Sequence, residues 1–240
     1  MHLLPSRLAA NTTLNAIQFG VLLLKSYQFQ DLVGPVDYLN THTHSFLDGI
    51  APPAIVAKAP NITWHYISEY NDFSPITASS GPPQIPTTTF NQTPTLDYLL
   101  IPGADIYHTF PVEATKFIQA RFPELKGLLT VCVGSLHLSR TGLLDGRRAA
   151  TNKVALRLTV EQGQFQQFRN VTWVKDERFV RDGKIWSSSG VTAGIDLAAE
   201  FARVNFDPEV NQVASEAFEY KANPAQPDAF AYILDGVDLN

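Results

Sequence analysis

Along the chain, unbroken apolar runs alternate with segments of helical periodicity. The first apolar run spans residues 16–24, a pattern typical of a strand buried on both faces. Similar runs cover residues 96–101 and 128–133, and each ends in a turn of small residues or proline. Between them, residues 113–122 place three apolar side chains on one face, as an amphipathic helix does. These patterns predict buried parallel strands joined by helices.

Shorter patterns complete the predicted architecture. Polar–apolar alternation predicts a strand over residues 61–68, and Asp182-Gly183 predicts a hairpin turn before a strand at 184–188. Gly34-Pro35 is expected to place proline in the first turn of a helix. The remaining expected elements are helices at 31–39, 154–168, 189–206 and 208–219 and a strand at 171–174. The alternation predicts a flavodoxin-like three-layer α/β/α sandwich with a mostly parallel central sheet.

No internal repeat or linker divides the chain into two comparable halves. We expect an N-terminal extension at residues 1–15 and one α/β domain at 16–221. An irregular tail at 222–240, rich in proline and alanine, is expected to wrap the surface.

Composition narrows the function classes. The 240 residues carry a formal net charge of −5 with 17% charged residues, so neither nucleic acid nor a membrane is an expected partner. No apolar run approaches transmembrane length. A single cysteine cannot form an internal disulfide, which favours a reducing, cytoplasmic location. No metal-ligand spacing and no phosphate-binding loop occurs, so neither a metal nor another cofactor is expected.

That single cysteine, Cys132, lies where the apolar run at 128–133 gives way to a helical segment at 135–140. A cysteine at the amino end of a helix tends toward the thiolate, the form that attacks electrophiles. The alternative is a small buried hydrophobe, the usual state of a free cysteine. Sites in open α/β sheets form at the carboxyl ends of strands, which would bring Asp31 and Gly103 toward Cys132.

The segments around Cys132 resemble the ThiJ/PfpI superfamily, which is glutamine-amidotransferase-like. Val-Cys-Val-Gly-Ser-Leu at 131–136 and the stretch at 141–151 resemble its nucleophile-elbow signature, and the resemblance extends over roughly residues 16–228. Asp-Leu-Val-Gly-Pro at 31–35 and Gly-Val-Thr-Ala-Gly-Ile-Asp at 190–196 are similar to the isonitrile hydratase branch rather than to the deglycase branch.

The resemblance implies a cysteine nucleophile, Cys132, and an acid/base, Asp31. In that branch the thiolate attacks the terminal carbon of an isonitrile, and water then releases an N-substituted formamide. Asp31 also has a structural alternative, since aspartate before Gly-Pro could cap the following helix. The cysteine context favours the acid/base role.

The resemblance also implies a set of binding groups around these two residues. Backbone N–H groups expected to stabilise developing negative charge belong to Gly103, Ala104 and Val133. Residues expected to line the substrate cavity are Gly190, Val191 and Thr192.

Three positions depart from the family pattern. Val133 stands where hydratases often have threonine, Ala104 stands in place of a second glycine, and Asn152 replaces a frequent histidine. His137 could reach the site from the helical segment, but we interpret it as a packed structural residue. The departures leave the substrate open.

The sequence therefore predicts a cofactor-independent lyase of the hydratase type that acts on a small molecule, and the resemblance implies a homodimer. One alternative is a glyoxalase- or deglycase-like enzyme in which Cys132 adds to a small carbonyl compound. Another is a non-catalytic binding or redox-sensing protein in which Cys132 is oxidised.

Overall fold

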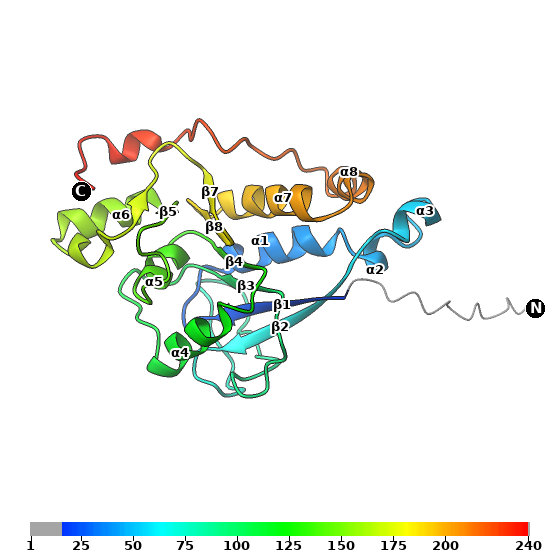
Figure 1. The fold of residues 1–240 in the computed structure, drawn as a ribbon, viewed down its shortest axis with the longest axis horizontal. Helices are drawn as coiled ribbons and strands as arrows, with labels where there is room; N and C mark the ends of the chain where they lie inside the picture. Colours follow the sequence, from blue (N-terminus) through cyan, green and yellow to red (C-terminus); the bar gives the residue numbers. More distant parts are fainter. Residues whose placement is uncertain (1–15, 240) are drawn as a thin grey trace, which may run out of the picture.

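A computed structural model describes residues 16–239, so the predicted extension at 1–15 lies outside the described residues (Figure 1). The central sheet has six strands in the order β2-β1-β3-β4-β8-β7, and only the β7–β8 pair is antiparallel. The strands are β1 (Ala16–Leu23), β2 (Asn61–Ser68), β3 (Tyr98–Ile101), β4 (Gly127–Thr130), β7 (Phe179–Asp182) and β8 (Ile185–Ser188). The predicted fold class, with its mostly parallel sheet, is confirmed.

Helices lie on both faces of this sheet, and this explains why its central strands are mostly apolar and buried. They are α1 (Phe29–Asn40), α2 (His44–Leu47), α3 (Pro53–Val56), α4 (Val112–Arg121), α5 (Gly134–Ser139), α6 (Lys153–Glu161), α7 (Ala193–Asn205) and α8 (Pro208–Ala217). Two 3-10 turns, η1 (Phe165–Phe168) and η2 (Ala231–Leu234), and a small parallel pair, β5 (Arg148–Ala149) and β6 (Thr172–Trp173), complete the chain.

The helices α1 and α7 pack side by side on one face of the sheet (Figure 1). Glycines permit this close approach. A Cβ atom on Gly34 would lie 2.9 Å from Ile195 of α7. A Cβ atom on Gly194 would lie 2.7 Å from Val131, so this glycine lets α7 approach the end of β4. The crossover through α4 runs in the opposite direction along the sheet from the crossover through α1, so right-handed connections place α4 on the other face.

Two predicted helix boundaries are wrong. Pro35 lies inside α1 rather than in its first turn, because the short β1–α1 connection starts the helix at Phe29. The helix predicted at 154–168 is interrupted at Gly163, whose φ of +69° is left-handed, and it divides into α6 and η1.

After α8 the chain is largely irregular and returns toward α6, against which η2 packs (Figure 1). One residue of this tail, Asp228, is nevertheless buried. Within residues 16–239, the helices are too short or too polar for any of them to cross a membrane.

Candidate active site

Cys132 occupies a sharp turn between β4 and α5. Its φ of +58° lies in the left-handed region, which residues other than glycine rarely adopt. The Thr151 hydroxyl donates a hydrogen bond of 3.0 Å to the Cys132 carbonyl and holds this conformation. A Cβ atom on Gly134 would lie 2.4 Å from the Ile101 carbonyl oxygen, so the turn requires glycine at position 134. The strained turn is therefore fixed from both sides.

Asp31 lies in the first turn of α1 and is completely buried. Its Oδ2 accepts a 3.0 Å hydrogen bond from the Gly103 N–H, and no side chain caps α1. Oδ1 is buried and has no hydrogen-bond partner within residues 16–239. Asp31 thus faces the end of β3 and the Cys132 thiol rather than its own helix terminus. The structure brings Asp31, Gly103 and Cys132 together.

The electrostatics of this pair follow from burial. Burial raises the pKa of Asp31 to about 7, although the Gly103 N–H and the Cys132 thiol oppose the shift. Burial, followed by the charge on Asp31, raises the pKa of Cys132, and the Val133 N–H and the Asn152 side chain only partly offset this. The expected resting thiolate is therefore wrong: α5 has only six residues, and burial outweighs its dipole. The pair rests as a thiol beside a carboxyl group that titrates near neutrality.

The three predicted backbone donors differ in their surroundings. The Gly103 N–H donates to Asp31, and the Ala104 N–H donates to Nε2 of His137 at 3.3 Å. The Val133 N–H acts to lower the pKa of the Cys132 thiol. Of the three, Val133 is the donor that acts on the Cys132 sulfur in this structure. The role of these groups in binding negative charge stays a prediction.

His137 supports the loop that follows β3. It is almost fully buried, and burial, with help from nearby Arg140, lowers its pKa to about 3, so the ring is neutral. His137 accepts the Ala104 N–H of this loop. Arg140 donates hydrogen bonds to two more of its groups, the carbonyls of Ile106 and His108, at 2.9 and 2.7 Å. As interpreted from the sequence, His137 is a packed residue, and with Arg140 it fixes the loop beside Asp31.

A cavity of about 250 Å³ lies near the elbow, although neither Cys132 nor Asp31 is among its lining residues. Gly190 and Thr192 line this cavity, whereas Val191 packs against the core and does not. Their role in binding a substrate stays a prediction. Asn152 also lines the cavity, and the Asn152 side chain acts to lower the pKa of the Cys132 thiol. Its Oδ1 accepts the Ala155 N–H at 3.0 Å and so caps α6. Asn152 is therefore the residue that links the cavity to Cys132.

Asn152 was expected only as the replacement of a family histidine, and the opposite wall of the cavity was not predicted. That wall includes Phe230 and Ile233 from the tail. An asparagine immediately before a helix was a usable signal for a cap, but nothing local pointed to the tail residues. In the described part of the chain, no three His, Cys, Asp or Glu side chains are grouped closely enough to hold a metal ion.

The three-layer arrangement, the strained turn at Cys132 and the buried Asp31 carboxyl define an α/β protein with a cysteine at the carboxyl edge of its parallel strands. Residues 20–204 match the DJ-1/PfpI family. The chain belongs to this family.

Among characterised relatives, the isonitrile hydratase of Pseudomonas putida is 33% identical over 211 residues, covering 87% of this chain and 81% of that protein. The HTH-type transcriptional regulator GbdR of Pseudomonas aeruginosa is 28% identical over 159 residues, covering 66% of this chain but only 41% of the regulator. Relatives of this chain therefore include both an enzyme and a regulator.

Solved structures agree on the fold. A ThiJ/PfpI family protein from Pseudomonas syringae superposes with a TM-score of 0.70 at 24% identity, covering 88% of this chain and 78% of that one. Drosophila melanogaster DJ-1beta gives a TM-score of 0.65 at 14% identity, with 86% and 99% covered. At these identities the similarity establishes the architecture alone.

Proposed function

We propose that the protein is a cofactor-independent, cysteine-dependent hydratase that converts an isonitrile into an N-substituted formamide. The similarity to an isonitrile hydratase over most of both chains supports the reaction class. The observation that carries the proposal is the buried Asp31 carboxyl, with a pKa of about 7, beside the Cys132 thiol. A carboxyl group of that pKa can take up and return a proton near neutral pH.

In the first step the Cys132 sulfur adds to the terminal carbon of R–N≡C. The thiol proton passes through Asp31 to that carbon, and the product is the covalent thioimidate R–N=CH–S. Oδ1 of Asp31 has no other partner among the described residues, which makes it the oxygen available to carry the proton. The step forms one C–S and one C–H bond and needs no oxidant or reductant.

In the second step water adds to the thioimidate carbon while Asp31 accepts a proton from it. The nitrogen is then protonated, the C–S bond breaks, and the sulfur leaves and recovers its proton. The products are R–NH–CHO and the free thiol, so one water is consumed per isonitrile. In each half of the cycle Asp31 therefore accepts a proton as a base and returns it as an acid.

The test is formamide production from one alkyl and one aryl isonitrile, measured by liquid chromatography with mass spectrometry. We expect wild-type turnover with a pH profile of kcat/KM that rises through about pH 7 as Asp31 ionises. Cys132→Ala and Asp31→Asn should abolish or strongly reduce it. Asp48→Asn, the same change at an exposed carboxylate, should not. Wild-type rates in both site variants would refute the proposal.

The same assay separates the alternatives. Methylglyoxal turnover without formamide production would favour the carbonyl enzyme. Burial and the raised pKa of Cys132 disfavour a redox sensor, because the thiolate is the form that peroxide attacks. The homodimer and the cytoplasmic location stay predictions, and light scattering after size-exclusion chromatography measures the first.

A further inference from the structure

The cavity lined by Asn152, whose side chain acts on the Cys132 thiol, is closed by residues distant in sequence from the elbow. One wall consists of Asn152, Gly190 and Thr192, and the tail supplies Phe230 and Ile233 to the other. The Phe230 side chain is 51% exposed, so part of its apolar surface is open for a ligand in the cavity to cover. At about 250 Å³ the cavity is below the roughly 300–1,000 Å³ typical of pockets for drug-sized ligands.

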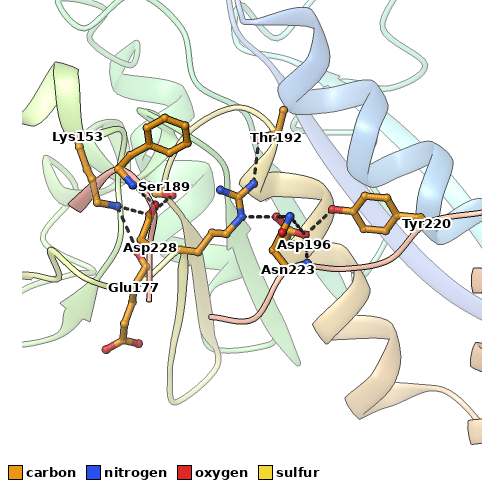
Figure 2. Close-up of polar contacts among 10 residues, drawn as sticks. Lys153, Glu177, Ser189, Thr192, Asp196, Tyr220, Asn223 and Asp228 are labelled. Atoms are coloured by element: carbon orange, nitrogen blue, oxygen red, sulfur yellow. Dashed lines mark hydrogen bonds and ion pairs between the residues drawn. The ribbon is translucent and has the colours of Figure 1, made fainter. Parts of the chain in front are cut away.

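A buried ion pair anchors the tail at this point. Nζ of Lys153 lies 2.5 Å from Oδ2 of Asp228, and both side chains are almost fully buried. The Ser189 hydroxyl donates to the same carboxylate at 3.2 Å, and the Phe230 N–H donates to Oδ1 at 2.9 Å (Figure 2). Because Lys153 and Ser189 themselves line the cavity, the residues that hold Asp228 also form part of the cavity wall.

A second cluster holds the tail on its approach to the cavity. The buried carboxylate of Asp196 accepts hydrogen bonds from the Tyr220 hydroxyl and from the Asn223 N–H, the latter at 2.8 Å (Figure 2). Arg178 pairs with Asp196, and its backbone N–H donates to the Ala225 carbonyl at 2.7 Å. The tail is thus fixed both before and at the cavity.

Every formal charge that borders the cavity is neutralised by a neighbour. Lys153 is paired with Asp228, and Arg178 is paired with Asp196. A charged substituent would have no free counter-ion here and would lose its hydration. Phe230 and Ile233 instead offer apolar surface.

We propose that the tail, through Phe230 and Ile233, forms a specificity-determining wall of the substrate cavity and is held in place by the Lys153–Asp228 ion pair. The cavity takes the substituent R of a neutral isonitrile, a compact apolar group such as a branched alkyl or a single aromatic ring. The identity of the substrate rests on the proposed function, but the role of the wall does not.

The test uses the fact that Cys132 is the only cysteine in the chain. The rate at which N-substituted iodoacetamides alkylate it can therefore be followed by intact-protein mass spectrometry. Phe230→Ala and Ile233→Ala are compared with Tyr232→Ala, an exposed side chain on the same turn that does not line the cavity. In the wall variants the rate ratio of the N-naphthyl to the N-methyl reagent should rise about tenfold. An unchanged ratio in both overturns the proposal.

The anchor is tested by Asp228→Asn against Asp235→Asn, which alters an exposed carboxylate of the same tail. We expect Asp228→Asn to raise the same rate ratio and to accelerate chymotrypsin cleavage of the tail at least several-fold. Ser189→Ala, which keeps the ion pair, should also raise the rate ratio and the rate of cleavage, but by less than Asp228→Asn does. If Asp228→Asn and Ser189→Ala behave like Asp235→Asn, the ion pair does not hold the wall.

Failure of this inference is distinguishable from failure of the proposed function. Absence of formamide from the wild-type protein refutes the function and leaves the alkylation test intact. Formamide production together with an unchanged alkylation ratio in the wall variants refutes the wall and leaves the function standing.

Discussion

Asp31 and Asp228 are both withdrawn from water, yet their surroundings push their pKa values in opposite directions. Asp31 has one backbone donor and the Cys132 thiol, and burial raises its pKa to about 7. At Asp228 burial also acts upward, but Lys153, the Phe230 N–H and the Ser189 hydroxyl together outweigh it and lower the pKa. Burial alone therefore does not define a reactive carboxyl group. The supply of partners decides whether the group exchanges protons or holds the chain together.

The largest effect expected from this contrast is on catalysis at Asp31. Asp31→Asn should lower kcat/KM for formamide formation by about 10²–10⁴-fold, the usual range for loss of an acid/base group. The free energy of unfolding at pH 8 should stay the same or rise, because the amide removes a buried charge that lacks a counter-ion. Formamide assays and urea denaturation measure the two. A loss below tenfold would contradict the acid/base role.

At Asp228 the same substitution should act on stability. Asp228→Asn leaves the buried Lys153 ammonium unpaired and should lower the free energy of unfolding by about 3–5 kcal/mol. Asp235→Asn, at an exposed ion pair, should change it by less than about 0.5 kcal/mol. Denaturant titrations at pH 7 measure the free energy of unfolding of both variants. Equal values for Asp228→Asn and Asp235→Asn would show that the buried ion pair does not stabilise the fold.

The pH dependence of stability gives a third comparison. The folded pKa of Asp31, about 7, exceeds the unfolded value near 3.8, so the folded state retains a proton that the unfolded state loses. Its stabilising contribution is complete at low pH and disappears as pH rises through about 7. From pH 5 to pH 8, wild type should therefore lose roughly 3 kcal/mol relative to Asp31→Asn. Parallel curves for the two proteins would show that the pKa of Asp31 is not raised.

The smallest effect concerns the second tail cluster. Tyr220→Phe removes one hydrogen bond to the buried Asp196 carboxylate and should cost about 1 kcal/mol of unfolding free energy. Tyr232→Phe is the matched control, because this tyrosine is exposed. Thermal and denaturant unfolding measure both, and an equal response would mean that the Tyr220 hydroxyl adds nothing.

Much of the fold was predictable because its signals are local. The apolar run at 16–24 and the alternation at 61–68 predicted β1 and β2 from the spacing of side chains alone. The start of α1 was not predictable from the position of Pro35, because the length of the preceding connection sets it. Periodicity identifies an element more reliably than its ends.

The site was predictable only in part, for a related reason. The ends of parallel strands meet at one edge, so the proximity of Asp31 and Cys132 followed from topology. The sign of the Cys132 pKa shift did not, because it depends on how deeply the thiol is buried and on a carboxyl group contributed by another helix. The Lys153–Asp228 pair joins residues 75 positions apart, and no local pattern encodes such a contact.

The left-handed backbone of Cys132 has a consequence for the order in which the chain folds. Such a conformation costs about 1–3 kcal/mol and persists only when its surroundings hold it. The Thr151 hydroxyl comes from 19 residues further along, and the end of β3 packs against Gly134. The turn therefore closes after these segments have docked. We expect Thr151→Val to speed unfolding while leaving the folding rate nearly unchanged, so that a refolding chain forms its sheet before the turn at Cys132 closes.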